Sequence, residues 1–181
     1  MPSQTVIRMP SLVRQSGNMN IQRAPIPGSQ TNTFAINALI RNVSGDAKVA
    51  VTSAALANQI WGQAAGKTPL TADRPPVVIP AHPSVANPVW AFDLSNDAEI
   101  EINGGVANGT DVTIGAALGT APVVGTGYNM LVPTTGTYAG IPFLDTATVT
   151  FPAFIVTAIV DPVTDYNPRV RVKVNPAALQ P

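Results

Sequence analysis

The chain has 181 residues, no cysteine and one histidine, and its ten basic and ten acidic residues give a net charge of zero. The absence of cysteine excludes disulfides, thiolate metal sites and a thiol nucleophile, and any histidine-dependent site would rest on His82 alone. A net-neutral chain with 11% charged residues, against a usual share of roughly 25%, gains little non-specific affinity for nucleic acid.

The charges are unevenly distributed. Residues 1–45 carry four arginines and no acid, residues 75–168 carry eight acids and no base, and residues 169–181 carry three bases. Because charges are screened over about 8 Å at physiological salt, the basic ends matter only where they lie close to an acidic surface. That surface is either the middle of this chain or part of a neighbour.

Residues 1–33 are predicted to form an extended N-terminal arm. Prolines and glycines interrupt the segment and its apolar residues are isolated, so it cannot fold alone. A disordered tail is one interpretation; an arm ordered against another subunit is favoured, because the segment keeps Ile, Leu, Val and Met. Its start has no apolar stretch typical of a secretory signal. The arm residues expected at a subunit or capsid interface are Ile7, Arg8, Leu12, Val13, Arg14, Ile21 and Arg23.

The next part of the chain predicts a hairpin, a short helix and a loop. Residues 34–40 and 48–52 are expected to be strands joined across 43–47. Residues 53–61 are the one segment expected to be helical, capped by Ser53 and ended by glycine. Residues 62–89 contain six prolines, each of which removes a ladder donor, and predict a long loop with a possible edge contact at Val77–Ile79.

The C-terminal half predicts short strands separated by turns. Asn103–Gly105 and Asn108–Gly109 are turn signals, and the last strand places its valines inward and its basic residues outward. No apolar stretch approaches the roughly 20 residues of a membrane span. The expected strands are 89–94, 99–102, 111–114, 121–124, 128–132, 146–151, 153–160 and 170–174.

This spacing predicts an all-β fold. Many short strands with dense turn signals favour an antiparallel sandwich, or a jelly-roll or barrel-like domain. Residues 34–181 are expected to form a single β-rich domain that carries the arm, the short helix and the proline-rich loop at 62–89.

The carboxylates of Asp97, Glu99 and Glu101 recur at every second residue, so on a strand they share one face at about 6.5–7 Å spacing. Such carboxylates can serve a glycosidase or a calcium site. The favoured interpretation is a solvated face or a docking surface for basic residues, because no converging turn or second catalytic strand is evident. The basic residues of the last strand that join this expected interface are Arg169, Arg171 and Lys173.

The remaining candidates have structural interpretations. His82 lies between two prolines and is expected to be an exposed loop imidazole. The tryptophans and tyrosines could form a sugar-binding platform, but Trp61 and Trp90 are expected to pack in the core. We therefore expect no catalytic residue, no metal, no cofactor and no small-molecule substrate.

The segment Asp161–Val174, the Gly/Thr/Val-rich stretch 104–140 and the proline-punctuated amino terminus resemble the capsid decoration (cement) proteins of tailed bacteriophages. The likeness is one of general style across most of the chain. It implies a β-rich, non-enzymatic, homo-oligomeric protein, a trimer, that is made in the host cytoplasm and binds the outside of an icosahedral capsid. Its implied partners are the major capsid protein and other copies of itself, with no nucleic acid and no membrane. The alternatives are a jelly-roll coat protein and a carbohydrate-binding or host-recognition module.

Overall fold

The structure is a computed structural model, and it confirms the predicted all-β class. Two sheets and a small strand pair account for nearly all of its secondary structure, and a 3-10 turn at Pro176–Ala178 follows the last strand. Within the described ranges, no helix is long and apolar enough to cross a membrane. The structure describes residues 7, 10–14, 22–27, 34–35, 37–44, 46–51, 60–66, 78–79, 88–94, 98–109 and 111–180.

The larger sheet closes into a barrel. Its ring runs β9–β14–β13–β11–β12 and returns to β9, and every pair is antiparallel except β9 with β12, which is parallel. β1 pairs with the first part of β9 and β10 with its last part. Closure removes the sheet edges that an open sheet would expose. The strands are β1 (Ser11–Arg14), β9 (Glu99–Asn108), β10 (Asp111–Thr113), β11 (Gly127–Leu131), β12 (Phe143–Asp145), β13 (Pro152–Ile159) and β14 (Arg169–Val174).

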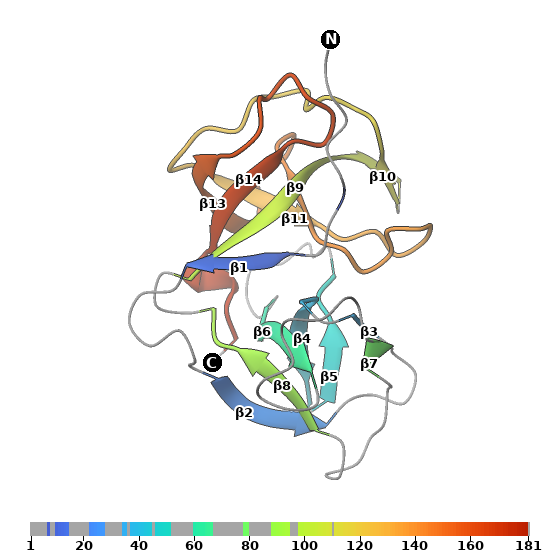
Figure 1. Cartoon of the computed structure of the whole chain (residues 1–181), viewed down its shortest axis with the longest axis vertical. Coiled ribbons are helices and arrows are strands. Elements are labelled where there is room, and N and C mark those ends of the chain that lie inside the picture. The colour runs from blue at the N-terminus through green and yellow to red at the C-terminus, as the bar shows by residue number, and fades with distance from the viewer. Residues whose placement is uncertain are drawn as a thin grey trace.

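A second sheet lies below the barrel in the view of Figure 1, with β1 at the boundary between them. Its order is β2-β8-β6-β4-β5, and β3 pairs separately with β7. Gln63 of β6 donates a 2.9 Å hydrogen bond from Nε2 to the carbonyl of Pro10, just before β1, which ties the two sheets together. The strands are β2 (Gln22–Pro27), β3 (Phe34–Ala35), β4 (Leu39–Val43), β5 (Asp46–Val49), β6 (Gly62–Gly66), β7 (Val78–Ile79) and β8 (Pro88–Phe92).

One apolar core is shared by both sheets. Phe154, Ile100 and Met130 fill the barrel and are fully buried, and Leu39 and Ile60 from the second part of the fold belong to the same cluster. Along β14 the residues alternate between half-buried and buried, as predicted, with the valines inward. The same alternation holds at the start of β9. Period-two patterning therefore positions the charged side chains of both strands on the outer face.

The predicted turn at 103–105 is wrong, because β9 continues through it. A Cβ at Gly104 would lie 2.7 Å from Leu118 Cδ1, and one at Gly105 would lie 2.9 Å from the Cβ of Phe143. These glycines serve close packing inside a strand rather than a turn. The second turn signal is confirmed, since β9 and β10 form a hairpin in which Asn108 pairs with Asp111.

The strand predicted at 146–151 is also wrong, and so is that at 121–124. The strand in this region lies earlier, at β12. The Asp145 carboxylate accepts hydrogen bonds from the backbone N–H of Ala147 and from the Thr148 hydroxyl, and Asn129 Oδ1 accepts one from the Phe151 N–H at 2.8 Å. These side chains take backbone N–H groups that a strand would use for pairing with its neighbour. The β-branched composition of residues 146–151 is therefore not sufficient to predict a strand.

The N-terminal half shows smaller differences. The strand expected at 34–40 is split into β3 and β4, and Asn37 between them has a φ of 70°. The hairpin is confirmed as β4–β5, with Val43 opposite Asp46. The loop prediction at 62–89 is wrong for β6, which lies inside the second sheet; the prolines begin only at Pro69, so they do not bear on this strand. Residues 53–59 of the predicted helix lie outside the described residues.

The N-terminal arm is corrected at the two segments that the structure describes. β1 pairs with β9 and β2 pairs with β8, both within this chain. Free edges of β8 and of the first part of β9 supply the hydrogen-bond partners that the prediction placed on a neighbouring subunit. Short alternating or proline-containing segments are well suited to such edge positions.

The end of the chain joins the two sheets, which the sequence analysis missed. Ile60 donates its N–H to the Ala178 carbonyl at 3.0 Å, and Gln180 donates its own N–H to the Ile60 carbonyl at 2.7 Å. The Gln180 side-chain amide also bonds both backbone groups of Asn42 in β4. The Gln180 side-chain amide both donates to and accepts from the backbone of β4, as a residue of a paired strand would. The segment after β14 therefore connects the barrel to β4.

Candidate functional site

The fold brings the predicted acidic and basic residues together in one chain. β14 pairs with β9 so that Arg171 lies opposite Glu101 and Lys173 opposite Glu99. On the other side of β9, Arg14 of β1 occupies the register position beside Glu99. We call the outward residues of β9 and β14, together with the carboxylate that joins them, the charged ladder: Glu99, Glu101, Asp161, Arg169, Arg171 and Lys173.

Arg169 is the centre of the charged ladder. Its guanidinium donates two hydrogen bonds to the Asp161 carboxylate and one to Glu101 Oε1, each 2.9 Å long. Its backbone N–H also donates to Asp161 Oδ2 at 2.9 Å. The hydrogen bonds with Asp161 raise the pKa of Arg169 above its ordinary value, although burial opposes the rise. Arg171 contributes less, since its Nε lies 3.8 Å from Glu101 Oε2.

This arrangement corrects the predicted use of these charges. The charge pattern of the sequence alone allows the basic ends to meet either this chain's middle or a neighbour, and the favoured interpretation is a neighbour. Glu101 is engaged by Arg169 and Arg171 of the same chain. Strands about 70 residues apart in sequence pair directly, so the basic residues Arg169 and Arg171 of the last strand meet acidic residues of the same chain.

The other predicted interface residues are more dispersed. Ile7 packs against a small cluster formed by Val112, Leu131 and Phe143. Leu12 packs against the main core, and Val13 is half-buried. The backbones of Arg14 and Arg23 lie in β1 and β2. The predicted residues that lie outside the described part of the chain are Arg8, Ile21 and Asp97, together with His82.

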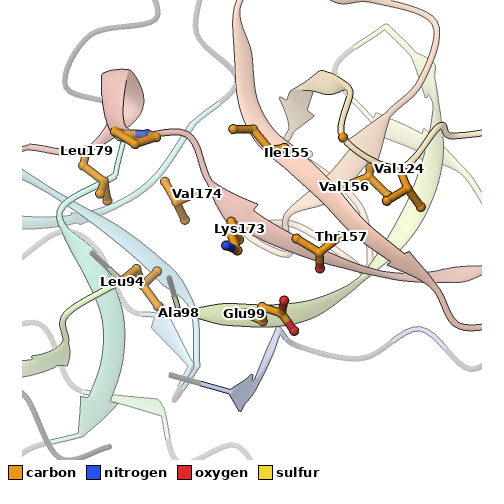
Figure 2. Close-up of a pocket in the computed structure, with 12 residues that line it drawn as sticks. Leu94, Ala98, Glu99, Val124, Ile155, Val156, Thr157, Lys173, Val174 and Leu179 are labelled. Atoms are coloured by element: carbon orange, nitrogen blue, oxygen red, sulfur yellow. The ribbon is translucent and has the colours of Figure 1, made fainter. Parts of the chain in front are cut away.

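An apolar groove of about 650 Å³ adjoins one end of the charged ladder. Figure 2 shows Glu99 and Lys173 close together beside Thr157, with Val124 and Val156 on one side of them and Leu94 and Leu179 on the other. β13, β14, β9, the 121–125 loop and the chain end all contribute to its lining. The alternating pattern of the sequence indicates Glu99 and Lys173, whereas no local pattern indicates the apolar lining residues. The lining residues are Leu94, Ala98, Glu99, Val124, Gly125, Ile155, Val156, Thr157, Lys173, Val174, Pro176 and Leu179.

Exposed apolar side chains continue from the groove. Val124 is 56% exposed and its neighbour Val123 is 58% exposed. The Tyr128 hydroxyl accepts a 2.9 Å hydrogen bond from the Val123 N–H, which holds this loop against β11. Large apolar side chains on a surface next to a groove are typical of interaction sites.

Two of the aromatic residues considered for a sugar platform, Trp61 and Tyr128, present no ring face to solvent; Tyr138 and Tyr166 are half-buried, and the side chain of Trp90 lies outside the described part of the chain. Trp61 and Tyr128 are each at most 5% exposed, so their ring faces are used in packing. Among the residues that the structure describes, no group of three His, Asp or Glu side chains converges as a metal site would require.

The comparisons with known proteins add no identity. No protein-family model matches the chain, and neither a curated protein nor a solved structure matches it.

The two arginines of the charged ladder should differ in their effect on stability. Arg169→Met is expected to lower the free energy of unfolding by about 1–2 kcal/mol, because it removes charge-assisted hydrogen bonds at a partly buried site. Arg171→Met, at a 41% exposed side chain, should cost less than about 0.5 kcal/mol. Urea unfolding of both variants measures this, and equal losses would contradict the central role of Arg169.

The pH dependence of that difference follows from the direction of the pKa shift. A group whose pKa is raised by folding stabilises the folded state fully when the pH is below its pKa in the unfolded chain. That stabilisation is lost only as the pH rises through its pKa in the folded protein. Both values for Arg169 lie far above neutral pH, so its guanidinium stays charged. The cost of Arg169→Met should therefore stay constant between about pH 6 and pH 9.

Proposed function

We propose that this chain is a structural virion protein that binds the outside of an icosahedral capsid and stabilises it by bridging neighbouring capsomers. Its partners are the major capsid protein and other copies of itself, and it catalyses no reaction. The resemblance to decoration proteins of tailed bacteriophages supports this function. The all-β fold, with its closed barrel fastened to a second sheet, agrees with that resemblance.

The observation that carries the proposal is the apolar groove with its exposed valines. Arg169, Glu101 and Asp161 of the charged ladder are paired within the chain, so attachment through them would first have to break internal pairs. Burial of apolar side chains contributes about 1.5–3 kcal/mol each when complete, while exposed ion pairs contribute about 0–1 kcal/mol. The groove is therefore the surface that we assign to the capsid subunit beneath the protein.

A repeating capsid strengthens weak attachment. When several copies of a bridging protein contact one another and the lattice, each contact raises the effective concentration of the next. A modest apolar surface on each copy is then sufficient.

The structure gives the two alternatives less support. A jelly roll has eight strands in two sheets, whereas the ring here is β9–β14–β13–β11–β12 with a parallel pair. A carbohydrate-binding module of the kind considered would need exposed aromatic faces, and two of the five candidate rings, those of Trp61 and Tyr128, are buried.

A matched pair of valine substitutions tests the docking surface. Val124 and Val149 are 56% and 57% exposed, and only Val124 lines the groove. We expect Val124→Asp to weaken binding to capsids at least about tenfold, because a charge would be buried against an apolar partner. Val149→Asp should bind as the unmodified protein does.

Binding is measured by co-sedimentation of the purified full-length chain with virions prepared from a strain that lacks its gene. Saturable binding that falls only partly as salt is raised is expected, since apolar burial is weakly screened. Absence of binding by the unmodified chain would contradict the proposed function. Equal binding by both variants would contradict the assignment of the groove.

A further inference from the structure

The sequence contains two Asn-Gly pairs, Asn103-Gly104 and Asn108-Gly109, and the fold places both on or at the end of β9. An Asn-Gly pair is chemically susceptible, because glycine lacks the side chain that would shield its backbone nitrogen from the asparagine amide. The same strand therefore offers two copies of one reactive sequence in different surroundings.

The first pair is held inside the barrel wall. Asn103 is 1% exposed, and its Nδ2 donates a 2.9 Å hydrogen bond to the Asn167 carbonyl. The nitrogen of Gly104 donates to the Pro168 carbonyl at 2.8 Å. The strand is paired on both sides at this position, with Phe143 and with Arg169. Neither the side chain nor the attacking nitrogen is available without unfolding.

The second pair lies at the tip of a hairpin. Asn108 and Gly109 are both exposed, and Asn108 is the last residue of β9. Gly109 has a φ of 61°, and apart from its own atoms and those of its two chain neighbours nothing lies within 4 Å of the place where a Cβ would be. β10 is only three residues long, so opening this end of the hairpin breaks few contacts.

We propose that Asn108 is a site of spontaneous deamidation and that Asn103 is protected. The backbone nitrogen of Gly109 attacks Cγ of Asn108, loses its proton, and forms a new C–N bond as the side-chain nitrogen leaves as ammonia. Water then opens the resulting succinimide at either carbonyl and gives aspartate or isoaspartate. One water is consumed and one ammonia released, and no oxidation or reduction occurs.

The modification would change the hairpin. Asn108 lies directly opposite Asp111 in the β9–β10 register, so deamidation places two carboxylates side by side. Like charges in this position destabilise a strand pair. β10 carries Val112, which packs with Leu131 and Phe143, so the new charge is expected to loosen that cluster. Deamidation of Asn108 would thus add a negative charge to the barrel surface slowly and irreversibly.

Peptide mapping by mass spectrometry tests the proposal on the folded full-length protein during incubation at mildly alkaline pH. Deamidated peptide is expected to accumulate at Asn108 at least about 100-fold faster than at Asn103, because Asn103 reacts only in the small unfolded population. In concentrated urea both sites should react. Asn108→Ser should abolish the fast product and leave the slow one.

Two results would overturn the proposal. One is equal rates at both sites in the folded protein, which would mean that the fold does not discriminate between them. The other is reaction at both sites in urea with no product at Asn108 in the folded protein, which would mean that the hairpin protects its tip.

Discussion

Replacing Asn167 by alanine is expected to lower the free energy of unfolding by about 3–5 kcal/mol. Asn167 is fully buried, and its Nδ2 donates hydrogen bonds to the carbonyls of Gly104 at 3.1 Å and Thr113 at 3.3 Å. Its Oδ1 accepts one from the Gly115 N–H at 2.8 Å. Alanine would leave these backbone groups without the partners that the asparagine side chain supplies, and of the three only the Gly104 carbonyl bond is fully buried.

The backbone adds to this cost. Asn167 has a φ of 49°, a left-handed conformation that asparagine tolerates and alanine disfavours by roughly 1–2 kcal/mol. Asn167→Gly removes the hydrogen bonds but keeps the conformation, so it should recover about 1 kcal/mol of the loss. Denaturant unfolding of the three proteins separates the two contributions. A loss below about 1 kcal/mol for Asn167→Ala would contradict the buried network.

Replacing Gly105 by alanine is expected to lower the free energy of unfolding by about 1–3 kcal/mol, because the added methyl group overpacks the site. The added Cβ would lie 2.7 Å from Val112 Cγ2 and 2.9 Å from the Cβ of Phe143. The Phe143 Cβ is fixed to the backbone of β12, which pairs in parallel with β9 at this point. The two strands would therefore have to separate to accept the methyl group.

Two other glycines give a graded comparison. At Gly104 the nearest atoms belong to the flexible end of the Leu118 side chain, and at Gly119 nothing lies within 4 Å of the added Cβ. Thermal unfolding should rank Gly105→Ala as the least stable, Gly104→Ala as intermediate and Gly119→Ala as close to the unmodified protein. Equal stability of all three variants would show that β9 and β12 are not in close contact.

Much of the barrel is predictable from the sequence, because alternation is a local signal. The inward valines of β14 and the first residues of β9 follow the two-residue period closely. The role of Gly104 and Gly105 is not predictable in this way, because it is not set by a local signal. Their role depends on Leu118 and Phe143, which are distant in sequence, so a pattern that indicates a turn conceals a close contact between strands.

The candidate site is only partly predictable. The residues of the charged ladder are identified by alternation, but that Glu101 meets Arg169 depends on the pairing of β9 with β14, which no local pattern encodes. The groove is even harder to predict from the sequence, because its lining comes from separate segments between Leu94 and Leu179. The arm prediction failed at β1 and β2 because a lack of periodicity does not reveal which edge a short strand will join.

Cryo-electron microscopy of the virion, with and without the gene for this chain, tests the proposed function most directly. We predict additional density on the outer capsid surface that fits the β9–β14 barrel, contacts more than one capsomer and places the groove of Val124 and Leu179 against the major capsid protein. Virions without the gene should lack that density and lose their genomes at a lower temperature. An unchanged outer surface, or density confined to the tail or the capsid interior, would contradict the proposal.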